Sequence, residues 1–216
     1  KRAHLEDDGY QPLSGIPREH TYSTLHTYYR GGLIAHNLRQ YMGDPAFFEG
    51  VSGLLDDWKF KAVGSYTVRD YLEPFATFNM EAFFDEWVFE PGLPDFHISS
   101  VKSTAVGGAF ETTVGVEQLL VGTKQYFGNA PLTIAFYSAS GEEVLRKVRS
   151  QGQSFIVKET LPFKPEIVRI NPYQELNYAM TQNTDTLFGR GFVASSRTDL
   201  NVQAVHITDS ARVFTE

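Results

Sequence analysis

The chain has 216 residues with a formal net charge of −7, and its 42% hydrophobic content is ordinary for a globular protein of one or two domains. An acidic chain without a run of lysine and arginine is not expected to bind nucleic acid, because neutralising phosphates requires a dense cationic surface. The absence of cysteine excludes disulfide frameworks, thiolate metal sites and cysteine nucleophiles.

No apolar run reaches the roughly 20 residues that a membrane-spanning helix needs, and the sequence shows no signal peptide. We therefore expect no membrane span. The chain opens at Lys1 without a methionine, so we interpret it as a piece of a longer protein.

Residues 1–95 have the periodicity of helices. Ser23 or Thr24 is expected to cap a first helix that runs to about Met42. Gly43 should end that helix, because glycine adopts the left-handed conformation that follows many helices.

A second helix is predicted to begin at Asp44 as N-cap, with Pro45 in the first turn. Six apolar residues share one face of it and are expected to pack in the core: Phe47, Phe48, Val51, Leu54, Leu55 and Trp58.

Two shorter helices complete this part. One is predicted to begin near Thr67, with Asp70 in a capping box, and to end or bend at Pro74. Asn79 should cap the other. Its core stripe is Met80, Phe83, Phe84, Trp87 and Val88.

The period changes to two after residue 95, which indicates short strands between glycine-containing turns. The sequence therefore predicts an α+β multidomain protein, in which residues 96–216 form an antiparallel immunoglobulin-like β-sandwich. Six runs are expected to be strands: residues 96–101, 108–116, 131–138, 144–149, 154–159 and 165–170.

Two further strands are predicted at residues 187–194 and 201–208. They either finish the sandwich or belong to a separate β segment, in which case the β part divides into residues 96–172 and 173–216.

One motif carries chemistry. It is Tyr28-Tyr29-Arg30-Gly31-Gly32, followed by Leu38-Arg39, Gly43-Asp44 and Phe47-Phe48. The pattern resembles the segment after the zinc site in the aminopeptidase N family, gluzincin zinc metallopeptidases related to leukotriene hydrolases. That family has Tyr, any residue, Lys, Gly, then Ala or Gly, and every later offset is kept here.

A second block extends the resemblance, so that it covers residues 22–94. Beyond that point, the likeness of the β part to family members is architectural only. The matching residues of the second block are Thr67, Asp70-Tyr71, Phe83-Phe84, Trp87, Gly92 and Pro94.

By this resemblance, Tyr28 stands at the position of the family's catalytic tyrosine, whose hydroxyl stabilises the oxyanion formed during peptide hydrolysis. The alternative is a half-buried aromatic on an amphipathic helix. Tyr29 is the adjacent competitor, but the offset to Arg30 selects Tyr28, and Arg30 itself replaces the family's Lys. Gly31 and Gly32 weaken a helix, so they predict a closely packed second backbone.

The family's zinc motif, His-Glu-any-any-His, is missing here, as are its glutamate ligand and its substrate-binding Gly-Ala-Met-Glu-Asn segment. The resemblance therefore implies a zinc cofactor held upstream in the parent enzyme, on whose N-terminal part this chain docks. Peptide substrates would be bound by that parent, and the isolated piece should be inactive. We expect no metal site in this chain, because its histidines are badly spaced and the acidic residues near His4 fit a solvated loop: Glu6, Asp7 and Asp8.

Two other hypotheses remain. The β part could be a binding module that uses surface aromatics, or the protein could be a catalytically degenerate relative with a structural role. The aromatics in question are Tyr126, Phe127 and Tyr137, for which sandwich core is the competing interpretation. The sequence leaves localisation unknown. An extracytoplasmic (periplasmic or secreted) bacterial location is suggested only by where members of the resembled family usually occur.

Overall fold

The computed structural model describes residues 11–20, 22, 24–178, 184–187 and 190–193. The chain forms two compact units, Lys1–Pro94 with Leu120–Pro131, and Asp95–Leu119 with Leu132–Glu216. The first unit therefore combines the helical part with a segment that follows it by 25 residues in the sequence. The predicted domain boundary after residue 95 stays a prediction.

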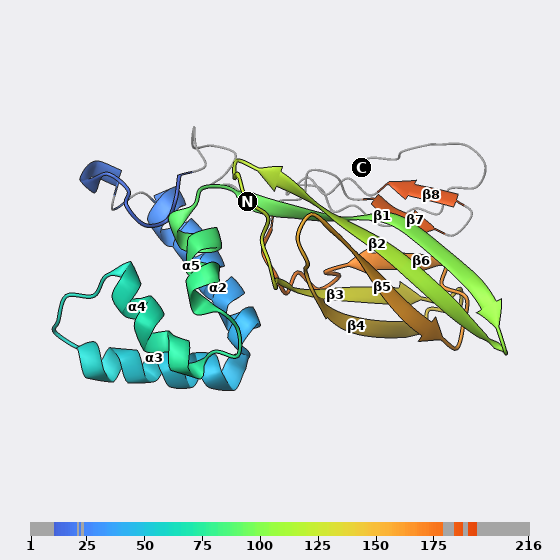
Figure 1. Ribbon diagram of the computed structural model, residues 1–216, viewed down its shortest axis with the longest axis horizontal. Coiled ribbons are helices and arrows are strands. Elements are labelled where there is room, and N and C mark those ends of the chain that lie inside the picture. Colours follow the sequence, from blue (N-terminus) through green and yellow to red (C-terminus); the bar gives the residue numbers. More distant parts are fainter. Residues whose placement is uncertain (1–10, 21, 23, 179–183, 188–189, 194–216) are drawn as a thin grey trace. The chain divides into compact units, whose positions relative to one another are not determined.

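The helices of the first unit are short and partly irregular (Figure 1). Within the part of the chain that the structure describes, no helix is long and apolar enough to cross a bilayer. In chain order they are the 3-10 helix η1 (Arg18–His20), the π-helix η2 (Thr24–Arg30), α2 (Gly31–Met42), α3 (Asp44–Trp58), α4 (Ser65–Leu72), the 3-10 helix η3 (Glu73–Phe75), α5 (Met80–Phe84) and the π-helix η4 (Asp85–Phe89).

The predicted first helix is in fact two elements, η2 and α2. No side chain caps α2, because the preceding π-helix runs directly into it through the helical backbone of Arg30. The predicted end is confirmed, since Gly43 has φ 80° and its N–H donates to the Arg39 carbonyl over 2.8 Å.

The predicted cap of α3 is wrong. Gly43 occupies the N-cap without a side-chain hydrogen bond, and the Asp44 carboxylate instead accepts two 2.7 Å hydrogen bonds from Arg39. Pro45 stands in the first turn as expected.

The predicted apolar face of α3 is also wrong in part, because Phe48 and Leu55 are exposed. The face that packs holds Gly50 and Gly53 instead. A Cβ on Gly50 would lie 2.8 Å from Leu72 Cδ2, and one on Gly53 would lie 2.8 Å from the Tyr71 hydroxyl. Close approach of α4 to these glycines therefore decides which side of α3 is covered.

The capping box predicted for α4 does not form. The helix begins at Ser65 after an extended Gly64 with no side-chain cap, and the Asp70 carboxylate pairs with Arg69 at 2.7 Å. Pro74 lies in η3, directly after α4, as its lack of an N–H requires. Asn79 is confirmed as a cap, since its Oδ1 accepts from the Ala82 N–H over 2.9 Å.

Trp87 is the centre of the core of the first unit, and its ring is fully buried. Its Nε1–H donates to the Tyr41 hydroxyl over 3.2 Å, and its ring stacks on Phe83. Phe127, from the added segment Leu120–Pro131, meets it edge-on at 4.6 Å between ring centroids. The predicted stripe of apolar residues, which lies in α5 and η4, is therefore part of the core, as expected.

The second unit contains two sheets, and the strands β1 and β2 of the first sheet are much longer than the others (Figure 1). One has the order β1-β2-β5 and the other β4-β3-β6-β7-β8. The strands are β1 (Leu93–Val106), β2 (Ala109–Val121), β3 (Pro131–Tyr137), β4 (Glu143–Arg149), β5 (Ser154–Leu161), β6 (Ile167–Ile170), β7 (Thr184–Leu187) and β8 (Arg190–Val193).

The pairing of these strands is antiparallel wherever its register is given, as between β2 and β5. Gly107 and Gly108 join β1 to β2, and both have the positive φ that a two-residue hairpin of type I′ requires. Val114 lies opposite Val157, and both are buried, whereas Ile156 on the other face is exposed. One face of this sheet is therefore covered and the other is solvated.

Each of the six predicted strand runs overlaps an observed strand, so the α+β class is confirmed. The run predicted at residues 187–194 is wrong as a single strand. It spans the end of β7 and all of β8, with Leu187 paired to Arg190. The run at 201–208 lies outside the described residues. The immunoglobulin-like arrangement of the sandwich stays a prediction.

Candidate functional site

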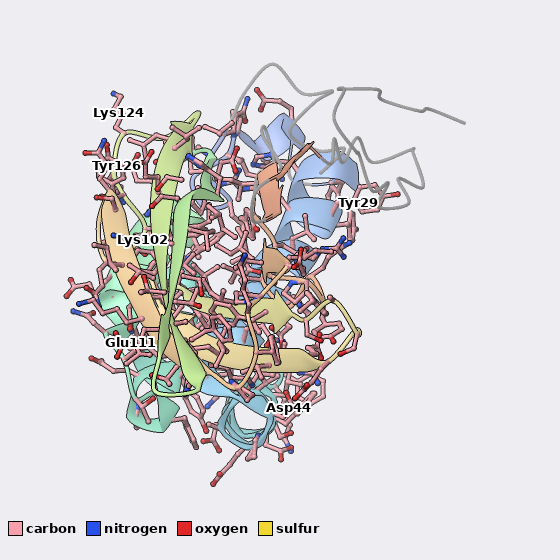
Figure 2. All side chains as sticks on the ribbon, turned by 90° about the vertical axis from the view of Figure 1, so that its right-hand side faces the viewer. Tyr29, Asp44, Lys102, Glu111, Lys124 and Tyr126 are labelled. Atoms are coloured by element: carbon pink, nitrogen blue, oxygen red, sulfur yellow. The ribbon has the colours of Figure 1, made fainter. Side chains whose placement is uncertain are left out.

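Tyr28 lies in the π-helix η2 and presents its side chain to solvent, with 59% of it exposed. Tyr29 is 51% exposed, and Figure 2 shows it pointing away from the ribbon. Neither hydroxyl has a hydrogen-bond partner among the described residues. The choice between the catalytic position and the alternative, a half-buried aromatic on an amphipathic helix, stays a prediction. A wide π turn is uncommon in proteins and is frequent at functional sites.

The opposite side of η2 is fixed. His26 is 4% exposed, and its Nε2 lies 2.8 Å from the Pro12 carbonyl oxygen. Arg30 is 2% exposed. The two buried residues stand four apart and flank Tyr28 in sequence, so one side of the turn is held while the tyrosine side is open.

The Arg30 guanidinium reaches the far end of the second π-helix, η4. Its Nη2 donates to the Glu90 carbonyl over 3.2 Å and to the Gly92 carbonyl over 3.3 Å. Its Nε and Nη1 are buried, and within the described residues neither has a hydrogen-bond partner. Burial lowers the pKa of Arg30 to about 10.

Residues 12–14, which we call the strap, also connect η2 to η4. The Pro12 carbonyl oxygen faces His26 of η2, and two residues later the Ser14 N–H donates to the Val88 carbonyl over 3.0 Å. The turn that carries Tyr28 is thus tied to η4 twice, through Arg30 and through this strap.

The close backbone predicted beside the glycine pair is not found. Within the described residues, a Cβ on Gly31 would meet Leu13 Cδ1 at 3.8 Å, an ordinary contact, and one on Gly32 would meet nothing within 4 Å. The start of α2 therefore has an open surface next to Tyr28.

Sequence reasoning missed Glu86, a half-buried carboxyl in η4. Its Oε1 accepts a 2.9 Å hydrogen bond from the Gly128 N–H. Burial raises the pKa of Glu86 to about 7, and the neighbouring Asp85 carboxylate adds to the rise while the Gly128 bond opposes it. Nothing in the sequence indicates this raised pKa, because the burial of Glu86 depends on the remote segment that supplies Gly128.

No metal centre forms among the residues that the structure describes, since none of their His, Asp and Glu side chains gather in groups of three or more. His97 has a single carboxylate nearby, with its Nε2 3.6 Å from Glu117 Oε2. His4 and the acidic residues beside it, like His206, lie outside the described residues.

The three aromatics considered for a binding module differ in burial and in the unit to which they belong. Phe127 is fully buried and belongs to the core of the helical unit, not to the second unit. Tyr126 beside it is partly exposed, whereas Tyr137 lies in β3 with the Arg169 guanidinium 5.9 Å from its ring centroid.

No protein-family profile matches the chain, and the comparison with curated proteins found no match. Among solved structures, the chain is similar to the crystal structure of Legionella pneumophila aminopeptidase A in complex with aspartic acid, with a TM-score of 0.59 and 13% sequence identity. The similarity covers 74% of this chain and 18% of that chain. At this identity the likeness is one of fold, and the chain shares its fold with part of an aminopeptidase.

Proposed function

We propose that this chain is part of a zinc aminopeptidase and that Tyr28 supplies the hydroxyl that stabilises the oxyanion during peptide hydrolysis. The observation that carries the proposal is the exposed Tyr28 on a π-helical turn whose opposite side is buried at His26 and Arg30. The fold shared with part of an aminopeptidase supports it.

The chemistry assigned to Tyr28 suits its position. A phenolic hydroxyl remains protonated near neutral pH and can donate a hydrogen bond at the end of a long, rigid ring. A donor aimed at an oxygen that gains charge stabilises the transition state more than the ground state. The Tyr28 hydroxyl has no partner among the described residues, so it is available to such an oxygen.

The zinc ligands would come from a part of the protein outside this chain, in keeping with the 18% of the Legionella structure that the similarity covers. The open surface at Gly31 and Gly32 is the proposed contact for that zinc-binding part, because nothing in the described chain covers Gly32. The isolated chain should then bind no catalytic zinc.

The isolated chain provides a first test. Calorimetric zinc titration should show no stoichiometric binding, and an aminoacyl-anilide substrate should not be turned over. Robust turnover by the isolated chain would contradict the proposal.

The decisive test is Tyr28→Phe in the full-length protein. Loss of one oxyanion donor should lower kcat by on the order of 100- to 1000-fold, with zinc content unchanged. Tyr29→Phe is the matched control, because it removes a hydroxyl from the next residue, which is also exposed. Equal kcat values for the two variants would remove Tyr28 from the mechanism.

A further inference from the structure

We propose that Arg30 is the positioning residue for Tyr28, and that it acts by tying the π-helix of the tyrosine to the end of the second π-helix. This inference rests on the proposed function for its catalytic consequence, but its structural part can be tested alone. Arg30 does not touch a reacting atom in this proposal.

The first step is the geometry of η2. Its buried residues, His26 and Arg30, both have partners in other segments, at Pro12 and at Glu90 and Gly92. Tyr28 has none among the described residues. The position of the Tyr28 ring therefore follows from how the buried side of the turn is held.

The second step is the rigidity of what Arg30 grips. The Glu90 N–H closes η4 by donating to the Asp85 carbonyl over 3.1 Å, and η4 itself is anchored by the buried Trp87. Gly92 has φ 81°, and a Cβ there would lie 2.3 Å from the Val121 carbonyl oxygen. The two carbonyls that accept from Arg30 thus belong to backbone that is also held by other contacts, a hydrogen bond at Glu90 and close packing at Gly92.

The third step is the choice of side chain. One guanidinium nitrogen bridges two carbonyls that are two residues apart, and the planar group holds this geometry with little freedom. Leaving Nε and Nη1 buried without partners among the described residues costs stability. A residue kept for stability alone would be better served by an apolar side chain of similar size.

The experiment uses the full-length protein with 3-fluorotyrosine placed at position 28. Arg30→Met keeps most of the packing volume and removes the donors, whereas Arg30→Lys keeps a donor but not the planar fork. Arg39→Met is the matched control, because Arg39 is a partly exposed arginine in α2, the helix that follows η2, and it pairs with Asp44.

For Arg30→Met we expect the fluorine resonance of residue 28 to shift or broaden. We expect kcat to fall by about tenfold or more with KM and zinc content nearly unchanged, since small misplacements of a catalytic group are costly. Arg30→Lys should lie between Met and wild type in both measurements, and Arg39→Met should match wild type.

An unchanged fluorine resonance in folded Arg30→Met would overturn the proposal. If the Met variant does not fold, Arg30→Lys decides, and a resonance identical to wild type would be the contradicting result. If Tyr28→Phe leaves turnover unchanged while the fluorine resonance still responds to Arg30, the proposed function fails but the tie between the π-helices stands.

Discussion

The helical unit contains two π-helices among its described residues, and they use the same irregular backbone in opposite ways. In η2 (Thr24–Arg30) the C-terminal half presents Tyr28 and Tyr29 to solvent. In η4 (Asp85–Phe89) the middle buries Trp87 and Val88. The wide turn is therefore not what makes a site.

The difference lies in what the neighbouring segments cover. The added segment Leu120–Pro131 closes over η4, with Phe127 on Trp87 and Gly128 bonded to Glu86. The described residues leave the tyrosine side of η2 open and hold its other side. The π-helix η4 is thus part of the core, whereas η2 carries exposed tyrosines. The following predictions test this difference.

The largest effect is expected for Trp87→Ala. Removing a fully buried indole that contacts Phe83, Tyr41 and Phe127 should lower the free energy of unfolding by about 3–5 kcal/mol. Chemical denaturation measures it. Trp58→Ala, at a partly exposed indole on α3, is the control and should cost clearly less. Equal losses would show that η4 is not the core.

Gly92→Ala should weaken the connection between the two π-helices. An alanine would be strained at φ 81° and would also clash with the Val121 carbonyl, so we expect a loss of about 2–4 kcal/mol in the free energy of unfolding.

Gly108→Ala separates strain from clash in that prediction. It has φ 88°, but a Cβ there meets nothing within 4 Å, so it should cost about 1–2 kcal/mol. A smaller loss for Gly92→Ala than for Gly108→Ala would contradict the tight packing at Gly92.

Glu86→Gln tests how Leu120–Pro131 covers η4, through the pH dependence of stability. Because folding raises the pKa of Glu86 from 4.5 to about 7, its contribution to stability is fully present below pH 4.5 and is lost as the pH rises through 7. Gln keeps an acceptor for Gly128 without a charge. It should raise the melting temperature at pH 8, by a stabilisation on the order of 1 kcal/mol after allowing for partial exposure, and much less at pH 5.

The contrary result for Glu86 is easily recognised. A difference in melting temperature between Glu86→Gln and wild type that is the same at pH 5 and pH 8 would mean that the carboxyl is not perturbed by folding.

The smallest effect on stability is expected for Tyr28→Phe, because its hydroxyl makes no hydrogen bond with the described residues. The free energy of unfolding should change by less than about 0.5 kcal/mol. Tyr41→Phe is the opposite case, since its hydroxyl accepts from Trp87 and donates to Gly128 over 3.4 Å, and it should cost about 1–2 kcal/mol. A large loss for Tyr28→Phe would place the tyrosine in the fold and weaken its proposed role.

Local patterns were predictable where the interactions are local. The cap at Asn79, the helix end at Gly43 and the position of the first six strand runs each depend on residues a few positions apart, and these were found. The cap at Asp44 was not found, because its carboxylate has a stronger partner in Arg39. A charged acceptor with a bidentate partner wins over a single backbone N–H.

For the candidate site, too, some features were predictable from the sequence and others were not. The sequence by itself determined that Tyr28 stands in register with Arg30 and the glycine pair, since that is a matter of spacing along the chain. Only the tertiary structure decided that Tyr28 is exposed while Arg30 is buried against Glu90 and Gly92, 60 and 62 residues away. Only it brought residues 120–131 into the helical core and so perturbed Glu86. Burial and the electrostatic field of a site depend on which distant segments meet, and spacing along one chain carries no record of that.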